Sequence, residues 1–422
     1  MAGQPLRRTI SLPQGVALYL GSVIGAGVLI LPGASATMAG PAAVLAWLFN
    51  SVLGIPLALT FAAMAGRMSD AGGVATYAAK AFGRDTGAVV GWFYLIGAAT
   101  AQAAVALTGA YYAAPYLGLG RGGVFLLAGV VLVVATASNA RGLRVSGRLQ
   151  LLFSATVAAL LTTAIVVSAP HVEAARWTPF APHGFGAVGE VAVLIFFAFF
   201  GWEAIAHLSE EFRNPARDVP RSTFIAIAVI TVLFAGVVVV TVGTGTYGSD
   251  EVNRAVITHL LGDALGDGAG AAAAAIALFI ALGTVNAFVA ATSRLGYALA
   301  RDGAAPRVLS RVDTRGVPLT SVLVVGGYAG LCLVAAHAVG WGPEALLTIP
   351  NALVVITYLS AMIAGVKLLT GARRALAAVA SVLCAVLLPF AGWALLIPLV
   401  VGAAVLLFLK SGARRGAGVT RR

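Results

Sequence analysis

The chain has 422 residues, of which 60% are apolar and only 10% are charged, and its formal net charge is +12. A soluble globular protein carries about 25% charged residues, so this composition excludes a water-soluble domain and, with it, a secreted or a disordered chain. One membrane-spanning helix needs ~20 mostly apolar residues, and a chain this apolar has room for roughly a dozen of them. We therefore predict an all-α polytopic membrane protein.

Long apolar runs separated by short polar breaks predict twelve transmembrane helices. In chain order they cover residues 13–38, 42–66, 87–117, 122–139, 148–169, 187–210, 221–247, 269–300, 319–340, 343–369, 373–391 and 393–410. No break is long enough to hold a soluble domain, so residues 13–410 are predicted to form a single transmembrane domain. Residues 1–12 are then a cytoplasmic N-terminal segment, and residues 411–422 are a cytoplasmic basic tail.

The basic residues gather at alternate ends of the predicted spans. One set of ends holds 23 of the 27 Lys and Arg residues, and the opposite set holds three, Arg121, Arg176 and Arg254. Cytoplasmic loops of membrane proteins carry such an excess of positive charge. The distribution predicts a multi-pass protein of the inner (plasma) membrane with both termini in the cytoplasm. Because topology accounts for the positive charge, no nucleic-acid partner is expected.

The first predicted span is interrupted by glycines at positions 21, 25 and 27. Glycines permit local unwinding, which leaves backbone N–H and C=O groups unpaired, and a membrane tolerates such backbone only around a protected cavity. A half-helix that begins near Gly27 presents N–H groups and a positive dipole end, which suit a carboxylate. The alternative is that these glycines only let helices pack closely.

The sixth predicted span carries Phe199-Phe200-Gly201-Trp202-Glu203 near its middle. Spans one and six begin two five-helix sets, residues 13–169 and 187–369, which run in opposite orientations because five is odd. Residues 373–410 form two extra helices. Paired interrupted helices in two inverted halves indicate a midplane substrate site in a secondary transporter. Free carbonyls near Ile24 and Phe200 suit an ammonium group, so the two breaks together suit an α-amino acid.

Glu203 is the only acidic residue that we place well inside the hydrocarbon, where a charge costs ~2.5–3.5 kcal/mol. His207 lies one helical turn further, on the same face. Three roles fit Glu203: it caps the half-helix, it carries a proton, or it only holds the break in shape. Both residues are candidates for coupling, and packing is the alternative for His207. Cys332 and Cys384 form no metal-ligand pattern, and no metal site is expected.

The phenylalanines around the Gly201 break suggest walls for an apolar side chain. The weaker candidates are Asn286, Phe288, Asn351 and Tyr358, and each is equally well interpreted as a helix-packing contact. No acidic residue other than Glu203 stands at the midplane to pair with a basic substrate. Neutral, apolar amino acids are therefore the expected substrates.

Two motifs resemble a known family. Ile24-Gly25-Ala26-Gly27-Val28-Leu29 and Phe200-Gly201-Trp202-Glu203-Ala204 are similar to the first and sixth helices of the amino acid–polyamine–organocation (APC) transporter superfamily. A closer resemblance, carried by residues 203–208, 364–369 and 392–393, is to bacterial exporters of methionine and branched-chain amino acids. It implies the leucine-transporter fold, a 5+5 inverted repeat with two extra C-terminal helices, in which helices 1 and 6 are unwound at their centres.

The resemblance also implies a set of substrate-binding residues. They are Val23, Gly25, Ala26 and Gly27 at the substrate's backbone groups, Phe197, Phe200 and Gly201 on the sixth span, Tyr94 on the third span, and Phe288 as a gate or wall on the eighth span. The lysine that some proton-coupled relatives carry on the fifth span is absent here. Thr292 and Ser293 match hydroxyl positions of sodium-dependent relatives, but two hydroxyls do not make a sodium site. No cofactor is expected, sodium coupling is unsupported, and Glu203 favours protons.

We therefore expect a secondary active transporter, not an enzyme, that works by alternating access on neutral apolar amino acids (methionine, leucine, isoleucine and valine) and exports them. An amino-acid or amine importer or exchanger of the same superfamily is the first alternative. A channel or a membrane-embedded enzyme fits less well, because the sequence shows neither a continuous polar stripe nor a nucleophile or metal motif. The expected partners are a small-molecule amino acid and the lipid bilayer, and the oligomeric state is left open.

Overall fold

The computed structural model describes residues 10–25, 27–65, 67, 73–142, 147–203, 212–314 and 316–419. Within these ranges the chain is helical apart from its connections. The one β-contact in the described ranges is an isolated parallel bridge between Ile10 and Phe212. The predicted all-helical architecture is confirmed.

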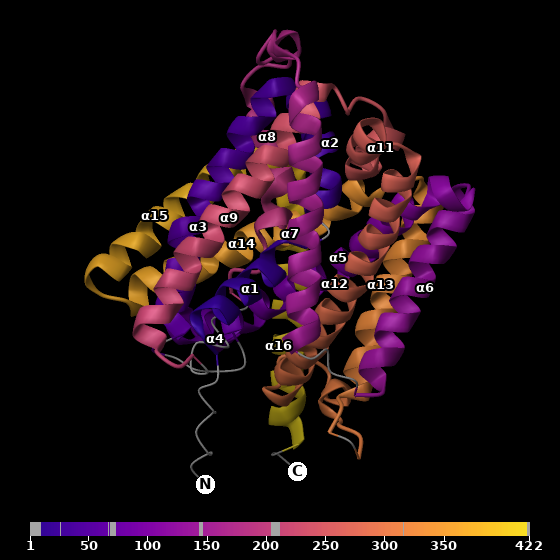
Figure 1. Ribbon diagram of the computed structural model, residues 1–422. Helices are drawn as coiled ribbons and strands as arrows, with labels where there is room; N and C mark the ends of the chain where they lie inside the picture. Colours follow the sequence, from indigo (N-terminus) through magenta and orange to yellow (C-terminus); the bar gives the residue numbers. More distant parts are fainter. Residues whose placement is uncertain are drawn as a thin grey trace.

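The helices follow one another along the chain with short connections. They are α1 (Leu12–Val23), α2 (Gly27–Ala39), α3 (Ala43–Ala65), α4 (Gly73–Phe82), α5 (Arg84–Leu117), α6 (Arg121–Ala140), α7 (Gly147–Ser168), α8 (Gly186–Leu194), α9 (Pro215–Thr244), α10 (Asp250–Arg254), α11 (Val256–Leu265), α12 (Asp267–Arg301), α13 (Leu319–Val339), α14 (Pro343–Leu368), α15 (Gly371–Leu387) and α16 (Leu396–Val419). Short 3₁₀ helices are η1 (Gly40–Ala42), η2 (Ala169–His171), η3 (Ala174–Trp177), η4 (Ile195–Phe199), η6 (Arg307–Ser310) and η7 (Leu388–Leu395). Figure 1 shows them packed in one bundle, with α1 and the end of α16 in its lower half.

Nine helical segments within the described ranges are long and apolar enough to cross a membrane. Two of them, Gly27–Ala65 and Gly371–Ser411, have 39 and 41 residues, about twice the ~20 that one crossing needs. The first contains α2 and α3, and the second contains α15 and α16. The protein is therefore a multi-pass membrane protein, and the total of twelve spans stays a prediction.

Two helices are longer than the spans predicted from the sequence, whereas the apolar segments long enough to cross the membrane, Arg217–Thr244 and Gly371–Ser411, keep close to the predicted bounds. α9 begins at Pro215 rather than at residue 221, because proline at the first helical position and Asn214 at the N-cap favour a helix start there. α16 continues to Val419, past the predicted end at residue 410, since residues 411–419 contain no proline that would stop it.

The two longest helices, α5 and α12, pack against each other with 34 and 35 residues. Small residues allow this close approach: a Cβ atom at Gly109 of α5 would lie 2.4 Å from the Cβ of Ala281 on α12. By contrast, the outer faces of α6, α13 and α16 expose large apolar side chains such as Leu126, Leu331 and Leu407. Such faces suit contact with lipid.

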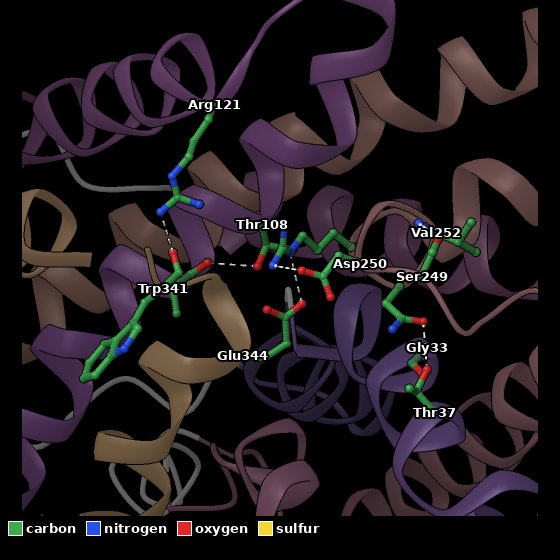
Figure 2. A network of polar contacts seen from close by, with 12 residues as sticks. Gly33, Thr37, Thr108, Arg121, Ser249, Asp250, Val252, Trp341 and Glu344 are labelled. Atoms are coloured by element: carbon green, nitrogen blue, oxygen red, sulfur yellow. Dashed lines mark hydrogen bonds and ion pairs between the residues drawn. The ribbon is translucent and has the colours of Figure 1, made fainter. Parts of the chain in front are cut away.

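A polar network surrounds the short helix α10 and connects it to three longer helices. Arg254 forms ion pairs with Asp250 (2.7 Å) and with Glu344 of α14 (3.7 Å), and it lies over the ring of Tyr111 on α5. Thr37 of α2 donates a hydrogen bond to Asn253 Oδ1 (3.1 Å). Figure 2 draws this network with Asp250 and Glu344 facing each other. α10 thus joins α2, α5 and α14 near α11, in the upper part of Figure 1.

Candidate functional site

The first interrupted helix consists of α1, which ends at Val23, and α2, which begins at Gly27. α1 begins with a capping box between Ser11 and Gln14, and it ends at Val23. The N–H of Gly25 then bonds to the carbonyl oxygen of Val23 (2.8 Å). α2 begins at Gly27, where a Cβ atom would lie 3.2 Å from the Cα of Ala198 in the second interrupted helix. Glycine at position 27 therefore lets the two breaks touch each other.

The second interrupted helix consists of α8 and η4, followed by residues 200–203. α-Helical geometry ends at Leu194, and the 3₁₀ helix η4 continues to Phe199. Phe200 is extended, and Gly201 has a φ of +126°, a conformation that L-residues with a side chain rarely adopt. The predicted break at Gly201 is confirmed, but the helix already changes its geometry at Ile195.

The two breaks border a cavity of about 260 Å³. Its walls come from α1, α2, α5, α7, η4, residues 200–203 and α12. The lining residues are Leu18, Gly21, Val23, Ile24, Gly25, Gly27, Tyr94, Phe153, Ser154, Val157, Phe197, Ala198, Phe200, Gly201, Glu203, Ile280, Gly283, Thr284, Ala287, Phe288 and Ala291. The cavity thus lies where the sequence places the substrate.

The structure brings together every described member of the predicted site. Eight of the predicted substrate-binding residues line the cavity, namely Val23, Gly25, Gly27, Tyr94, Phe197, Phe200, Gly201 and Phe288, and so does Glu203. The ninth, Ala26, and the coupling candidate His207 lie outside the described residues. That these side chains and backbone groups bind a substrate stays a prediction.

Aromatic rings form one wall of the cavity. Phe288 of α12 makes edge contacts with the rings of Phe197 and Phe200, with centroids 6.3 and 6.0 Å apart. The Tyr94 ring of α5 lies 5.2 Å from the Phe200 ring. This wall offers apolar surface to whatever occupies the cavity.

Glu203 is buried, with 4% of its surface exposed, and tyrosines donate to both of its carboxylate oxygens. The hydroxyl of Tyr94 donates to Oε1 (2.9 Å), and the hydroxyl of Tyr358 on α14 donates to Oε2. Tyr358 also accepts a hydrogen bond from the N–H of Gly201 (3.1 Å). The carboxylate therefore holds the break in shape by joining it to α5 and α14, and its role as a proton carrier stays a prediction.

Tyr358, Asn351 and Asn286 support the site without lining it. Asn351 donates to the carbonyl oxygen of Leu194 (2.8 Å), at the end of α8. Asn286 accepts at Oδ1 from Asn139 of α6 (2.8 Å), which is a helix-packing contact. The carbonyl oxygen of Leu194, at the end of α8, is thus occupied by a side chain, and the expected binding of an ammonium group near Phe200 stays a prediction.

The sequence analysis missed the walls supplied by α7 and by the first half of α12. Ser154 and Val157 of α7 are buried at the cavity, and Thr284 of α12 faces the first break. A Cβ atom at Gly25 would lie 3.5 Å from Cγ2 of Thr284. Neither Ser154 nor Thr284 gives a signal in the sequence, because hydroxyl residues are common in membrane helices.

The two hydroxyls that match sodium-dependent relatives make hydrogen bonds within α12. Thr292 Oγ1 donates to the carbonyl oxygen of Phe288 (2.5 Å), and Ser293 Oγ donates to that of Ala290 (3.2 Å). Gln102 of α5 also donates to Thr292 Oγ1 (3.4 Å). These contacts stabilise the packing of α12 on α5.

Comparison with known proteins places the chain among transporters. The sequence model of the amino acid permease family matches residues 14–418. The chain is 37% identical over 410 residues to the uncharacterized amino acid permease YecA of Bacillus subtilis, covering 96% of each protein. It is 29% identical over 421 residues to the L-methionine/branched-chain amino acid exporter YjeH of Escherichia coli, covering 98% of this chain and 99% of the relative. It is 27% identical over 329 residues to the branched-chain amino acid permease BcaP of Bacillus subtilis, covering 74% of this chain and 70% of the relative.

Proposed function

This chain belongs to the amino acid permease family of the APC superfamily, whose members are transporters and not enzymes, and on that premise we propose that it exports neutral apolar amino acids by alternating access. The proposed substrates are methionine, leucine, isoleucine and valine. The observation that carries the proposal is the cavity between the two interrupted helices, with an aromatic wall and a helix N-terminus at its edge.

The proposed substrate pose follows from the charges that the cavity offers. The first N–H groups of α2, which begins at Gly27, have no partner within the helix, and the positive dipole end suits the substrate carboxylate. The carboxylate of Glu203 is occupied by two tyrosine hydroxyls. We therefore assign the substrate ammonium to backbone carbonyls near Ile24, and the apolar side chain to the rings of Phe197, Phe200 and Phe288.

Selectivity against charged side chains follows from the same lining. Among the described residues around the cavity there is no Lys or Arg, and Glu203 is the one acidic side chain. A substrate with a charged side chain would bury that charge without a partner, which costs several kcal/mol. Apolar substrates meet no such cost.

The proposed topology has twelve spans in the leucine-transporter arrangement, with both termini on the cytoplasmic side of the inner (plasma) membrane. The split of 23 to three basic residues supports this orientation. In that frame α10 and its ion pairs close the external end, and the cavity extends along α1, past Gly21 and Leu18, toward the cytoplasm. Opening to the outside then requires α10 to separate from Thr37 and Glu344.

Export is proposed because YjeH, a relative that matches nearly the whole chain, is named as an exporter of methionine and branched-chain amino acids. Import or exchange is the second candidate, because another relative is named as a branched-chain amino acid permease. We propose protons as the driving ion through Glu203, with His207 as the second coupling candidate, and no requirement for sodium.

A transport assay tests this proposal. Purified protein in proteoliposomes is expected to move labelled leucine, with competition by methionine, isoleucine and valine and none by arginine or glutamate. Replacing sodium with choline should leave the rate unchanged. Competition by arginine as strong as that by methionine would contradict the proposed site. Efflux from preloaded cells that exceeds uptake supports export, and the reverse supports import.

A further inference from the structure

Two buried asparagines on two neighbouring helices, α3 and α14, bind the second interrupted helix. Asn50 of α3 donates to the carbonyl oxygen of Ala192 (3.0 Å), and Asn351 of α14 donates to that of Leu194 (2.8 Å). Both side chains are at most 2% exposed. Neither asparagine lines the cavity. Both asparagines therefore bind the backbone of this helix, and neither forms part of the cavity wall.

The two carbonyls belong to the last turn of α8, where the backbone changes from α-helical to 3₁₀ hydrogen bonding. The last four carbonyl groups of an α-helix have no amide partner within the helix. From Ile195 onward η4 uses the 3₁₀ pattern, in which an N–H bonds to the carbonyl three residues earlier, as Phe200 N–H does to Phe197 O. The buried carbonyl of Ala192 precedes η4 and needs a donor from elsewhere, because an unpaired one is costly in an apolar interior, and Asn50 supplies that donor. The carbonyl of Leu194 is the first acceptor of the 3₁₀ pattern, and Asn351 adds a second donor to it.

Helix α14 supports both ends of the interrupted stretch. Asn351 bonds at Leu194, and Tyr358 accepts from Gly201 N–H. The two α14 residues are seven positions apart, and so are Leu194 and Gly201. Seven residues span two turns of an α-helix, so Asn351 and Tyr358 lie on one face of α14. One face of α14 therefore contacts both ends of the interrupted stretch.

We propose that Asn50 and Asn351 are positioning residues that determine where the second interrupted helix leaves α-helical geometry. They act through the backbone of α8, and so they set where Phe197 and Phe200 stand against the first break. This role rests on the proposed function for its effect on transport, but the backbone effect itself requires no substrate.

Hydrogen–deuterium exchange of the purified full chain tests the backbone effect. Asn50→Leu and Asn351→Leu remove the donor at similar side-chain size, and amides in residues 195–203 are expected to exchange about tenfold faster than in the wild type. The matched control is Asn139→Leu. Asn139 is also buried, but it bonds to Asn286 between the uninterrupted helices α6 and α12. Its loss should leave exchange in residues 195–203 unchanged.

Transport supplies the second readout. In proteoliposomes Asn351→Leu is expected to raise KM for leucine about tenfold, whereas Asn139→Leu should leave KM within twofold of the wild type. Asn351→Gln keeps an amide donor and should recover part of the loss. If the Asn351→Leu protein does not fold, Asn50→Leu, which removes the donor to Ala192 O, supplies the test.

Unchanged exchange in residues 195–203 of both folded leucine variants would overturn the assignment, and so would an equal rise in the Asn139→Leu control. If the wild-type protein transports no apolar amino acid, the proposed function fails. The exchange measurement then decides the positioning role by itself.

Discussion

The two interrupted helices reach similar broken geometries by different means. At residues 24 and 25 of the first break the described hydrogen bonds are local, from Ile24 N–H to Leu20 O and from Gly25 N–H to Val23 O. One side chain from another helix, Tyr112 of α5, donates to Leu29 O in the first turn of α2. At the second break, side chains from three other helices bond to α8 or to residues 201–203. The first break depends on the absence of side chains, and the second depends on particular side chains far away in sequence. Substitutions should therefore affect them differently.

The largest effect is expected from Gly27→Val, where the two breaks touch. A Cβ atom at this position would lie 3.2 Å from the Cα of Ala198 and 3.4 Å from the ring of Phe197, and valine adds two further methyl groups. Overpacking of this kind costs about 1–3 kcal/mol, and it also crowds the proposed carboxylate position. Transport of leucine in proteoliposomes should fall to background, while the protein still inserts into the membrane.

Gly330→Val is the matched control for this prediction. Gly330 lies on α13, where nothing stands within 4 Å of an added Cβ atom. The Gly330→Val protein should retain wild-type transport and melting temperature. Normal transport by a correctly inserted Gly27→Val protein would refute the proposed site at the first break.

A smaller loss is expected from Gly201→Ala, which tests the second break. Gly201 has a φ of +126°, and a side chain in such a conformation costs about 1–3 kcal/mol. Relaxation of that strain would move the neighbouring Phe200 and Glu203. We expect a lower melting temperature together with a KM for leucine about tenfold higher.

Gly392→Ala separates strain from position. Gly392 also has a positive φ, +53°, but it lies between α15 and α16 with open space around it. The Gly392→Ala substitution should lower the melting temperature and leave KM for leucine unchanged. If the two variants change KM equally, the Gly201 conformation has no special connection to the cavity.

The smallest effect on binding is expected from Glu203→Gln. The glutamine retains one carbonyl oxygen that accepts from a tyrosine hydroxyl, so Tyr94 or Tyr358 keeps a partner, but the side chain no longer titrates. Leucine binding should stay within a few fold of the wild type, measured by isothermal calorimetry. The dependence of transport rate on pH should disappear.

Two other results for Glu203→Gln would change the interpretation. A wild-type pH profile would mean that Glu203 only holds the break and that coupling occurs elsewhere. Loss of leucine binding itself would mean that the charged carboxylate, through its two tyrosine contacts, is needed to shape the cavity.

The residues that the sequence identified without the family resemblance, which alone implied Tyr94, carry a local signal. Gly25, Gly27 and Gly201 interrupt apolar helices, and Glu203 is an acidic residue within an apolar span. The residues that sequence analysis missed carry none. Ser154 and Thr284 are ordinary components of a membrane helix, and they became part of the cavity only because α7 and α12 pack beside α1.

The sequence by itself determined the membrane class, the positions of both breaks and the acidic residue at the second break, Glu203. The reason is that transfer from water to lipid and the backbone freedom of glycine are properties of single residues and short stretches. The tertiary structure alone decided which helices enclose the cavity, that Tyr94 and Tyr358 donate to Glu203, and that Asn351 bonds to Leu194. An apolar helix can pack through any of its faces, so the partner of a buried polar group depends on how all the helices are arranged together.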